Sequence, residues 1–288
     1  MANSIALVTK YLPYLDQVYA YASRTSVLDA PADLVRQTAD AKTIMIAKTS
    51  MDGLANYDRN TGFVEGAASL TWETKTLQYD RGRSFMIDAM DDLETLGIAF
   101  GTLASEFIRT KVVPEVDALR FAKYAAGGHS EADGALDADS VVEAIDAAVA
   151  YMKEAEVDLT GAHLFITPTL FNAVKNSDKF TRPLTPGQNP NRNFGAYDEL
   201  GIIEVPQTRF YTTCTAGADG FTTGGNKINF QIVAPSAVLQ VAKHAKLRVF
   251  DPDVNQKADA YKIDYRIYHD AWTFENKQNG IFTSHAGA

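Results

Sequence analysis

One continuous run of strand-forming residues limits the possible folds of this chain more than any other feature. From Thr71 to Asp88 the sequence reads TWETKTLQYDRGRSFMID, rich in Thr, aromatic and Ile residues, without Pro and with Gly82 as its one weak point. Charged residues interrupt both faces of the run. An unbroken strand of this length would span on the order of 50 Å, which exceeds the radius of a compact chain of this size. The run is therefore not expected to be an ordinary core strand.

A second strand candidate, KTIMIAKT, precedes this run at Lys42 to Thr49. The segment between them, SMDGLANYDRNTGFVEGAAS, holds three Gly and few large apolar groups. The pattern predicts a long hairpin over residues 42–88 with a loosely structured tip. Because two-stranded hairpins are marginally stable alone in water, we expect this one to rest on a partner surface.

A long helix is predicted directly after the hairpin. Asp91 is placed as an N-cap and Glu94, three residues later, completes a capping box. Pro114 is expected to end or kink the helix, which gives it about six turns. Its apolar stripe would consist of Leu93, Leu96, Phe100, Leu103 and Phe107, and Gly97, Gly101 and Ala104 would form a second face that allows another backbone to approach.

The rest of the chain alternates helix and strand signals. Ser140 and Glu143 form a second capping box, and the helix after it is expected to bury Val142, Ile145, Val149 and Met152. GAHLFITP and LGIIEVP read as buried strands, TLFNAVKNS as a helix, and TAGADGFTTGGN as a loop leading into KINFQIVAP. In YKIDYRIYH, Tyr261, Ile263, Tyr265 and Ile267 alternate with polar residues, which predicts a half-buried strand.

Composition and charge narrow the class of protein. The 288 residues are 46% hydrophobic and 22% charged, which is ordinary globular usage. The net charge of −9 disfavours nucleic acid and anionic membranes as tight partners. Cys214 is the single cysteine, so no internal disulfide framework is possible. The first residues lack a basic n-region, and no apolar run reaches the ~18 residues of a membrane span, so we expect a soluble, intracellular protein.

Motifs for catalysis, metals or cofactors are weak. DPDVNQKADAYK begins like a calcium loop but has Gln256 at the turn glycine and Lys262 at the bidentate Glu. GFTTGGNK lacks the Ser or Thr that follows the Lys of a phosphate loop. Cys214 has no His near it in sequence. The five histidines are scattered, with no metal-ligand spacing: His129, His163, His244, His269 and His285. The sequence predicts no enzyme, no cofactor and no metal site.

The order of segments resembles that of the major capsid proteins of tailed bacteriophages, with the Hong Kong 97-type fold. KYLPYLDQVYAYASRTSVLD is similar to an N-terminal arm, and the stretch from YDRGRSFMID to RFAKYA to the base of an extended loop running into a spine helix. GAHLFITPTLFNAVKNS and LGIIEVPQ resemble the axial domain, and AYKIDYRIYHDAWTFENKQNGIFTSH the returning strands of the peripheral domain.

The resemblance implies an α+β fold and a division of the chain into five parts. These are an N-terminal arm (1–41), an extended loop (42–88), a peripheral domain with the spine helix (89–134), an axial domain (135–233) and the C-terminal peripheral strands (234–288). With the arm beginning in the first dozen residues, we expect no built-in scaffolding segment.

The implied function is a shell subunit of the virion, assembled in the host bacterial cytoplasm. The chain would form hexamers and pentamers around double-stranded DNA held by non-specific contacts, with a separate scaffolding protein, a portal and decoration proteins as possible partners and no membrane. The hairpin would lie across a neighbouring subunit that supplies the counter-charges its own fold lacks. The residues expected at this inter-subunit contact are Arg81, Arg83, Trp72 and Tyr79.

Two alternatives stay open at this point. An encapsulin-type nanocompartment shell would share the architecture, and a neighbouring cargo-enzyme gene instead of terminase and portal genes would identify it. A secreted carbohydrate-active α+β protein, suggested by the Asn- and Tyr-rich loops, would be identified by a sugar-binding screen on dispersed monomer.

Overall fold

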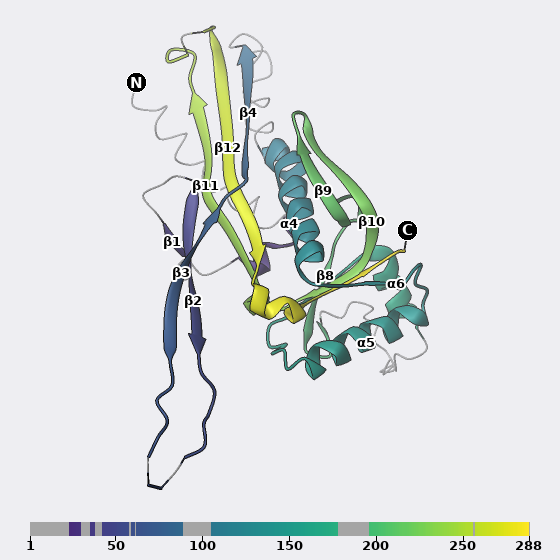
Figure 1. Ribbon diagram of the computed structural model, residues 1–288. Helices are drawn as coiled ribbons and strands as arrows, with labels where there is room; N and C mark the ends of the chain where they lie inside the picture. Colours follow the sequence, from purple (N-terminus) through teal and green to yellow (C-terminus); the bar gives the residue numbers. More distant parts are fainter. Residues whose placement is uncertain are drawn as a thin grey trace, which may run out of the picture.

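The computed structural model of the chain describes residues 23–29, 35–37, 42–57, 59–60, 62–88, 105–177, 196–255 and 257–287. These residues form a body of two lobes with one long helix between them, and a narrow two-stranded arm that projects away from the body (Figure 1). The described residues contain three sheets, with strand orders β1-β2-β3, β11-β12-β4, and β5-β13-β10-β6-β8-β7 with β9 added on β10.

The predicted hairpin exists, but it is shorter than expected. β2 (Thr43–Met51) pairs antiparallel with β3 (Ala68–Thr76), and β1 (Val35–Gln37) pairs with the other edge of β2. The chain leaves β3 at Thr76, buries Leu77 and continues as β4 (Tyr79–Asp88). β4 pairs along its whole length with β12 (Ala260–Thr273) in another sheet. Residues 79–88 are therefore not part of the hairpin, because β12 offers them a partner strand.

The long helix runs through Pro114, so of the two outcomes expected at this proline, an end or a kink of the helix, the end is wrong. Residues 105–107 are helical, the π-helical turn η3 covers Ile108–Val112, and α4 covers Val113–Gly127. The Val113 N–H donates to the Ile108 carbonyl, five residues back. Such a widened turn directly before a proline accommodates a residue that has no N–H and would crowd a regular turn. The predicted cap at Asp91 and Glu94, and the stripe and small-residue face over residues 93–104, lie outside the described residues.

The larger lobe confirms most of the remaining elements. The strands β6 and β8 and the helix α6 lie where the sequence predicted them, whereas the predicted loop TAGADGFTTGGN is a hairpin of β9 and β10. Gly220, with φ of +132°, allows the tight reversal that closes this hairpin. The elements of this lobe are β5 (His129–Ala132), α5 (Ser140–Glu154), β6 (His163–Ile166), α6 (Pro168–Asn176), β7 (Ala196–Tyr197), β8 (Leu200–Glu204), β9 (Tyr211–Gly217), β10 (Gly220–Val233) and β13 (Ile281–His285). β13 pairs with β10, so the last strand belongs to this sheet and not to the sheet that contains β12 and β4.

α5 is capped three residues earlier than the sequence suggested. The Asp137 carboxylate accepts hydrogen bonds from the Ser140 N–H and hydroxyl, and the Ser140 hydroxyl accepts one from the Asp137 N–H. These hydrogen bonds lower the pKa of Asp137. The predicted inner stripe of α5 is confirmed, since Val142, Ile145, Val149 and Met152 are all buried.

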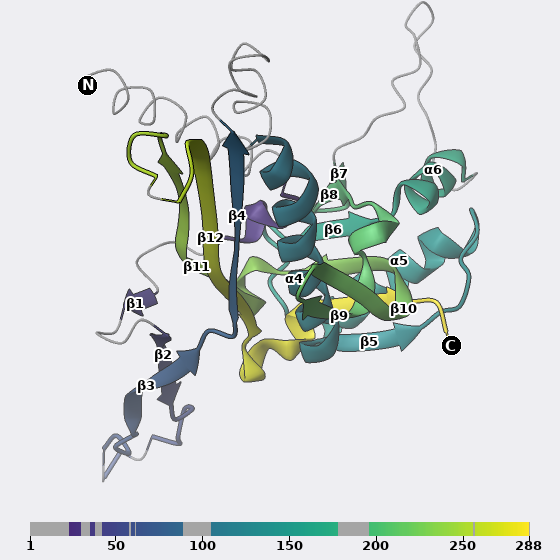
Figure 2. The same cartoon turned by 90° about the horizontal axis from the view of Figure 1, so that it is seen from above.

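α4 lies between the two body sheets, which Figure 2 shows from above. On one side it contacts β12, and on the other β9, β10 and β13. β12 pairs with β11 (Val238–Phe250) and confirms the predicted alternation, with Ile263, Tyr265 and Ile267 buried and Arg266 exposed. Short 3-10 helices complete the described chain: η1 (Ser26–Leu28), η4 (Gln207–Arg209), η5 (Pro235–Ala237) and η6 (Glu275–Gly280).

Candidate assembly surface

Exposed large apolar side chains gather on the arm, here defined as residues 43–76. At its tip Leu54 is fully exposed and Phe63 is 87% exposed, and the rings of Tyr57 and Phe63 lie 4.8 Å apart. The few large apolar groups that the tip carries are therefore exposed. Exposed apolar groups that are contiguous mark interaction sites in soluble proteins. The exposed large apolar residues of the arm are Met51, Leu54, Tyr57, Phe63, Val64, Leu70 and Trp72.

The root of the arm, by contrast, is fixed to the body. Ile44, Ile46 and Leu77 are buried in one cluster with Leu239 and Tyr268 of the body. The Tyr268 hydroxyl donates to the Leu77 carbonyl at 3.1 Å, which satisfies a buried backbone group where β3 ends. The arm thus has a rigidly held root and a tip that contacts little of its own subunit.

A second link fixes the crossing from β3 to β4. The Gln78 N–H donates to the buried Asp270 carboxylate at 3.0 Å, and Lys123 of α4 forms an ion pair with the same carboxylate. The Lys243 ammonium also donates to the Thr43 carbonyl at 3.0 Å. The arm's direction relative to the body is therefore set by contacts on both of its strands.

The four residues predicted at an inter-subunit contact fall into two groups. Trp72 lies on β3 in the arm, 39% exposed. Tyr79, Arg81 and Arg83 lie on β4 and share one face of it, because alternate residues of a strand point the same way. The structure brings these three together and leaves Trp72 apart.

Both arginines have partners inside their own subunit. Arg81 Nε lies 2.5 Å from Glu115 Oε1 of α4, and its guanidinium also donates to the Gly220 carbonyl at 3.1 Å. The Arg83 guanidinium lies 3.3 Å from the Asp219 carboxylate at the β9–β10 turn. The expectation that the fold lacks counter-charges for these arginines is wrong. Glu115 and Asp219 were missed because nothing local in the sequence links them to β4.

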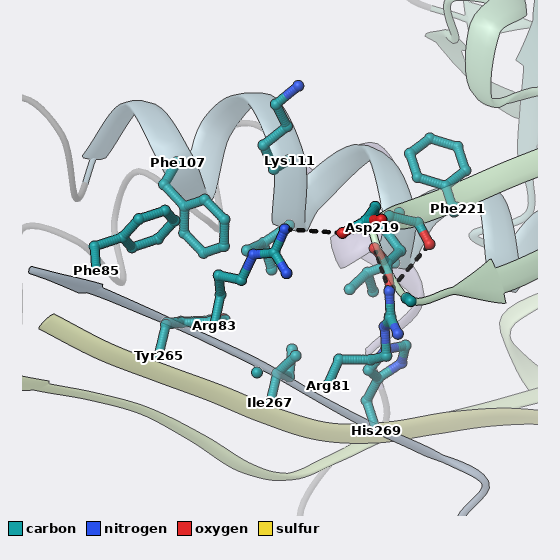
Figure 3. Close-up of a pocket in the computed structure, with 16 residues that line it drawn as sticks. Arg81, Arg83, Phe85, Phe107, Lys111, Asp219, Phe221, Tyr265, Ile267 and His269 are labelled. Carbon is teal, nitrogen blue, oxygen red and sulfur yellow. Dashed lines mark hydrogen bonds and ion pairs between the residues drawn. The ribbon is translucent and has the colours of Figure 1, made fainter.

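These ion pairs lie at a cavity of about 490 Å³ between β4, β12, the start of α4 and the β9–β10 turn (Figure 3). Phe85, Phe107 and Tyr265 form one aromatic wall, with ring centroids 4.8 Å apart for Phe85 and Phe107 and 6.0 Å apart for Phe107 and Tyr265. Phe221 and Lys111 also line the cavity. Phe107 is thus half-buried at this cavity instead of deep in the core. The cavity is called the aromatic pocket below.

His269 lies at the inner end of the aromatic pocket. It is 1% exposed, its ring stacks on Tyr79 with centroids 5.7 Å apart, and neither ring nitrogen has a hydrogen-bond partner among the described residues. Burial, helped by the positive charges of Arg120, Lys123 and Arg81, lowers the pKa of His269 to about 3. The imidazole is therefore neutral at physiological pH.

A buried charge cluster attaches Ser23 and Thr25 to α4. Asp117 of α4 is completely buried and accepts hydrogen bonds from the hydroxyls of Ser23, at 2.8 Å, and Thr25, at 2.7 Å. Arg209, just before β9, lies 3.0 Å from the same carboxylate. Asp117 thus connects three segments that are distant in the sequence. Because removing one member of a buried ion pair is strongly destabilising, loss of this carboxylate is expected to destabilise the subunit.

The described residues offer little for catalysis. They contain no group of three or more His, Cys, Asp or Glu side chains that could hold a metal ion. Burial raises the pKa of the Cys214 thiol to about 11, which keeps it protonated and weakly nucleophilic. No helix among these residues is both long and apolar enough to cross a membrane.

Comparison with known proteins gives matches to solved structures alone: no family model and no curated protein sequence matches this chain. The capsid structure of cyanophage P-SCSP1u is 12% identical, with a TM-score of 0.60 over 88% of this chain and 85% of that one. The mature capsid of bacteriophage PhiM1 is 13% identical, with a TM-score of 0.58 over 85% and 82%. A structure from Gordonia phage Cozz is 13% identical, with a TM-score of 0.59 over 94% and 86%.

These similarities cover 85–94% of this chain and 82–86% of the matched chains, at identities of 12–13%. The fold of this chain is the α+β fold of phage capsid proteins, as its resemblance to the Hong Kong 97-type fold predicted.

Proposed function

We propose that this chain is a major capsid protein that assembles with copies of itself into the icosahedral shell enclosing phage double-stranded DNA. The observation that carries this proposal is the arm, whose root is buried in its own subunit while its tip exposes Leu54, Phe63 and Val64. A monomer gains nothing from such a tip, whereas a neighbouring subunit would cover it. The capsid fold supports the same function.

The free energy gained by burying the exposed side chains of the arm favours assembly. Complete burial of one large apolar side chain stabilises by about 1.5–3 kcal/mol. A closed shell repeats the same contact at every subunit, so contacts that are modest in a pair become large in the assembly. Tyr79, Arg81 and Arg83 would act at the contact from β4, and Trp72 would act at it from the arm.

The same proposal divides the chain into the parts of a capsid subunit. Residues 1–41 would form an N-terminal segment held at Ser23 and Thr25 by Asp117, and the extended loop would comprise residues 42–78. β4, α4, β11 and β12 would form the peripheral domain. The larger sheet with α5 and α6 would form the axial domain.

The expected partners follow from charge and class. With a net charge of −9, binding to the packaged DNA is expected to be weak and independent of sequence, through basic residues that face the lumen. A separate scaffolding protein, a portal and decoration proteins are further partners of such a shell, which is built in the bacterial cytoplasm and acts without catalysis.

Expression of the chain followed by sedimentation and negative-stain electron microscopy tests the proposal. Capsomers or closed shells are the expected products. A monodisperse monomer of 31.4 kDa at high concentration across salt and pH would contradict it. A tight, sequence-selective complex with DNA at physiological salt would contradict the expected role of the nucleic acid.

A further inference from the structure

The aromatic pocket combines an apolar floor with one buried polar side chain at its inner end. Tyr265, Ile267 and His269 alternate along β12, so all three side chains point to the face of the sheet that packs on α4. Phe85 and Phe107 add aromatic surface beside Tyr265. Pockets that bind small molecules are lined in this way, by apolar and aromatic groups with a few polar groups that fix the orientation of the ligand.

The walls of the pocket are fixed by contacts between distant segments of one subunit. Arg81 of β4 bonds to Glu115 of α4 and to the Gly220 carbonyl in the β9–β10 turn, and Arg83 lies 3.3 Å from Asp219 in the same turn. The volume of about 490 Å³ falls in the range of cavities that bind small molecules, about 300–1,000 Å³. The subunit alone therefore forms a cavity large enough for a ligand.

His269 gives the pocket its hydrogen-bonding requirement. The side chain is 1% exposed, and neither ring nitrogen has a hydrogen-bond partner within the part of the chain that the structure describes. Buried polar groups are nearly always hydrogen-bonded, and leaving one without a partner is costly. A neutral imidazole offers one N–H donor and one acceptor nitrogen, and a hydroxyl group can pair with either. A ligand hydroxyl at the inner end of the pocket would therefore satisfy His269.

The charges of the pocket favour an uncharged ligand. Arg81 and Arg83 already have carboxylate partners, so an anion would have to compete with Glu115 and Asp219 for them, and a cation would be repelled by the two guanidinium groups. Figure 3 shows the Lys111 ammonium directed away from the other labelled residues, so it does not supply an anion site inside the pocket.

The spacing along β12 sets the length of the ligand. Four residues separate Tyr265 from His269, which corresponds to roughly 13 Å of strand. Ring contact takes up about 4 Å of this at one end and a hydrogen bond about 3 Å at the other. A single ring packed against Tyr265 would thus fall short of His269, whereas two fused rings bearing a hydroxyl would reach it and cover Ile267 between them.

We propose that the aromatic pocket binds an uncharged two-ring aromatic molecule, whose outer ring packs against Phe85, Phe107 and Tyr265 and whose hydroxyl at the inner end hydrogen-bonds to His269. This site belongs to the single subunit and goes beyond the proposed shell function, which does not require it. Because the pocket lies between β4, β12 and the β9–β10 turn, a bound molecule would contact both lobes of the body and stabilise the folded subunit by mass action.

Binding of 2-naphthol to the full chain tests the proposal, with two probes of the same ring shape as controls. Naphthalene lacks the hydroxyl, and 2-naphthoate carries a carboxylate in its place. Equilibrium dialysis at pH 7 with fluorescence detection measures all three. We expect 2-naphthol to bind at least about tenfold more tightly than either control, the difference that one hydrogen bond to a buried group makes. At equal concentration, 2-naphthol should also raise the midpoint of thermal unfolding more than naphthalene does.

Three variants assign the two ends of the ligand. His269→Phe keeps a ring and removes both nitrogens, so 2-naphthol should then bind no better than naphthalene. His163→Phe makes the same change at a half-buried histidine of β6 outside the pocket, and the preference for 2-naphthol should remain. Phe85→Leu, which removes one ring of the aromatic wall, should weaken 2-naphthol and naphthalene by a similar factor of several-fold.

Equal affinity of the unsubstituted chain for 2-naphthol and naphthalene, or binding of neither, would overturn the proposal, and so would tighter binding of 2-naphthoate. This comparison involves no substitution, so it decides the matter even where a variant fails to fold. A preference for 2-naphthol that survives His269→Phe would overturn the hydrogen bond assigned to His269. Shells that form without any binding of 2-naphthol would overturn the ligand site and leave the proposed function intact.

Discussion

Two of the antiparallel hairpins among the described residues, β2–β3 and β9–β10, differ in how their tips are held. The tips of β2–β3 and β9–β10 both contain several Gly residues. The β9–β10 tip is held against the body by Arg83 at Asp219 and by Arg81 at the Gly220 carbonyl. Among the described residues of the β2–β3 tip, Leu54, Phe63 and Val64 are exposed. Whether a hairpin tip is held against the body or is exposed thus depends more on the neighbouring segments of the fold than on the residues of the hairpin.

The roots of the two hairpins differ less than their tips. Phe210, directly before β9, is buried against Phe121 of α4, and Leu77, directly after β3, is buried against Tyr268. Both hairpins are thus anchored by an apolar residue at one end. The two hairpins therefore differ mainly at their tips. Each of the following experiments changes either the exposed arm tip or the body.

Deleting residues 53–66 and closing the arm with a short Gly-containing turn should have the largest effect. The backbone bond from the Asp52 N–H to the Ala67 carbonyl, 3.0 Å long, brackets the deleted segment, so β2 and β3 can still pair. Shell formation is expected to be lost, while circular dichroism and the unfolding midpoint stay unchanged, because loop shortening alters closure entropy little. Normal shells from this variant would show that the tip has no role in assembly.

Phe121→Ala should affect stability strongly without any arm residue being touched. Phe121 is completely buried between Phe165 and Phe210, with ring centroids 5.1 and 4.9 Å away. The expected loss in free energy of unfolding is about 3–5 kcal/mol. Phe63→Ala, an equal truncation at the exposed tip, should change it by less than about 0.5 kcal/mol. Urea unfolding of dispersed subunits measures both, and equal losses would contradict the contrast between tip and core.

Acidification should weaken the body through His269, next to the pocket where the β9–β10 tip is held. Its pKa in the folded subunit is about 3, against 6.5 for the unfolded chain. Between these values the unfolded state binds a proton that the folded state does not, so stability is fully present above pH 6.5 and falls as the pH drops toward 3. The slope from one such group is about 1.4 kcal/mol per pH unit.

His269→Phe tests that assignment, since it removes the titrating group and keeps an aromatic ring. Urea unfolding at pH 7, 6 and 5 should show a shallower loss of stability in the variant than in the unsubstituted chain. Parallel curves for the two proteins would mean that other groups control the acid response.

The two arginine pairs should give the smallest effects, and unequal ones. Arg81 and Glu115 are mostly shielded from water, so Arg81→Gln is expected to destabilise the subunit by about 1–2 kcal/mol. Arg83 and Asp219 are exposed, so Arg83→Gln should change stability by less than about 0.5 kcal/mol and only at low salt. Thermal unfolding at two salt concentrations distinguishes them, and a larger effect for Arg83 would contradict the structure.

Short-range periodicity predicted the elements that bury one face locally. The stripe of α5, the strands β6 and β8, and the alternation of Ile263, Tyr265 and Ile267 in β12 depend on residues close in sequence, and all are found as expected. The candidate site was predicted only in part. Tyr79, Arg81 and Arg83 share a face of β4 as any alternating residues do, but their partners Glu115 and Asp219 come from distant segments.

Local propensity determined that Thr71 to Asp88 would be extended, because its Thr and aromatic residues favour strands throughout. Only the tertiary structure decided that this extended segment breaks at Leu77. Residues 79–88 pair with β12, which is far along the chain, and Leu77 is buried in the body between β3 and β4. The same holds for the helix through Pro114 and for the docked β9–β10 hairpin. Strand pairing and side-chain packing join residues that are remote in sequence, and no local pattern records which of several equally suitable partners lies within reach.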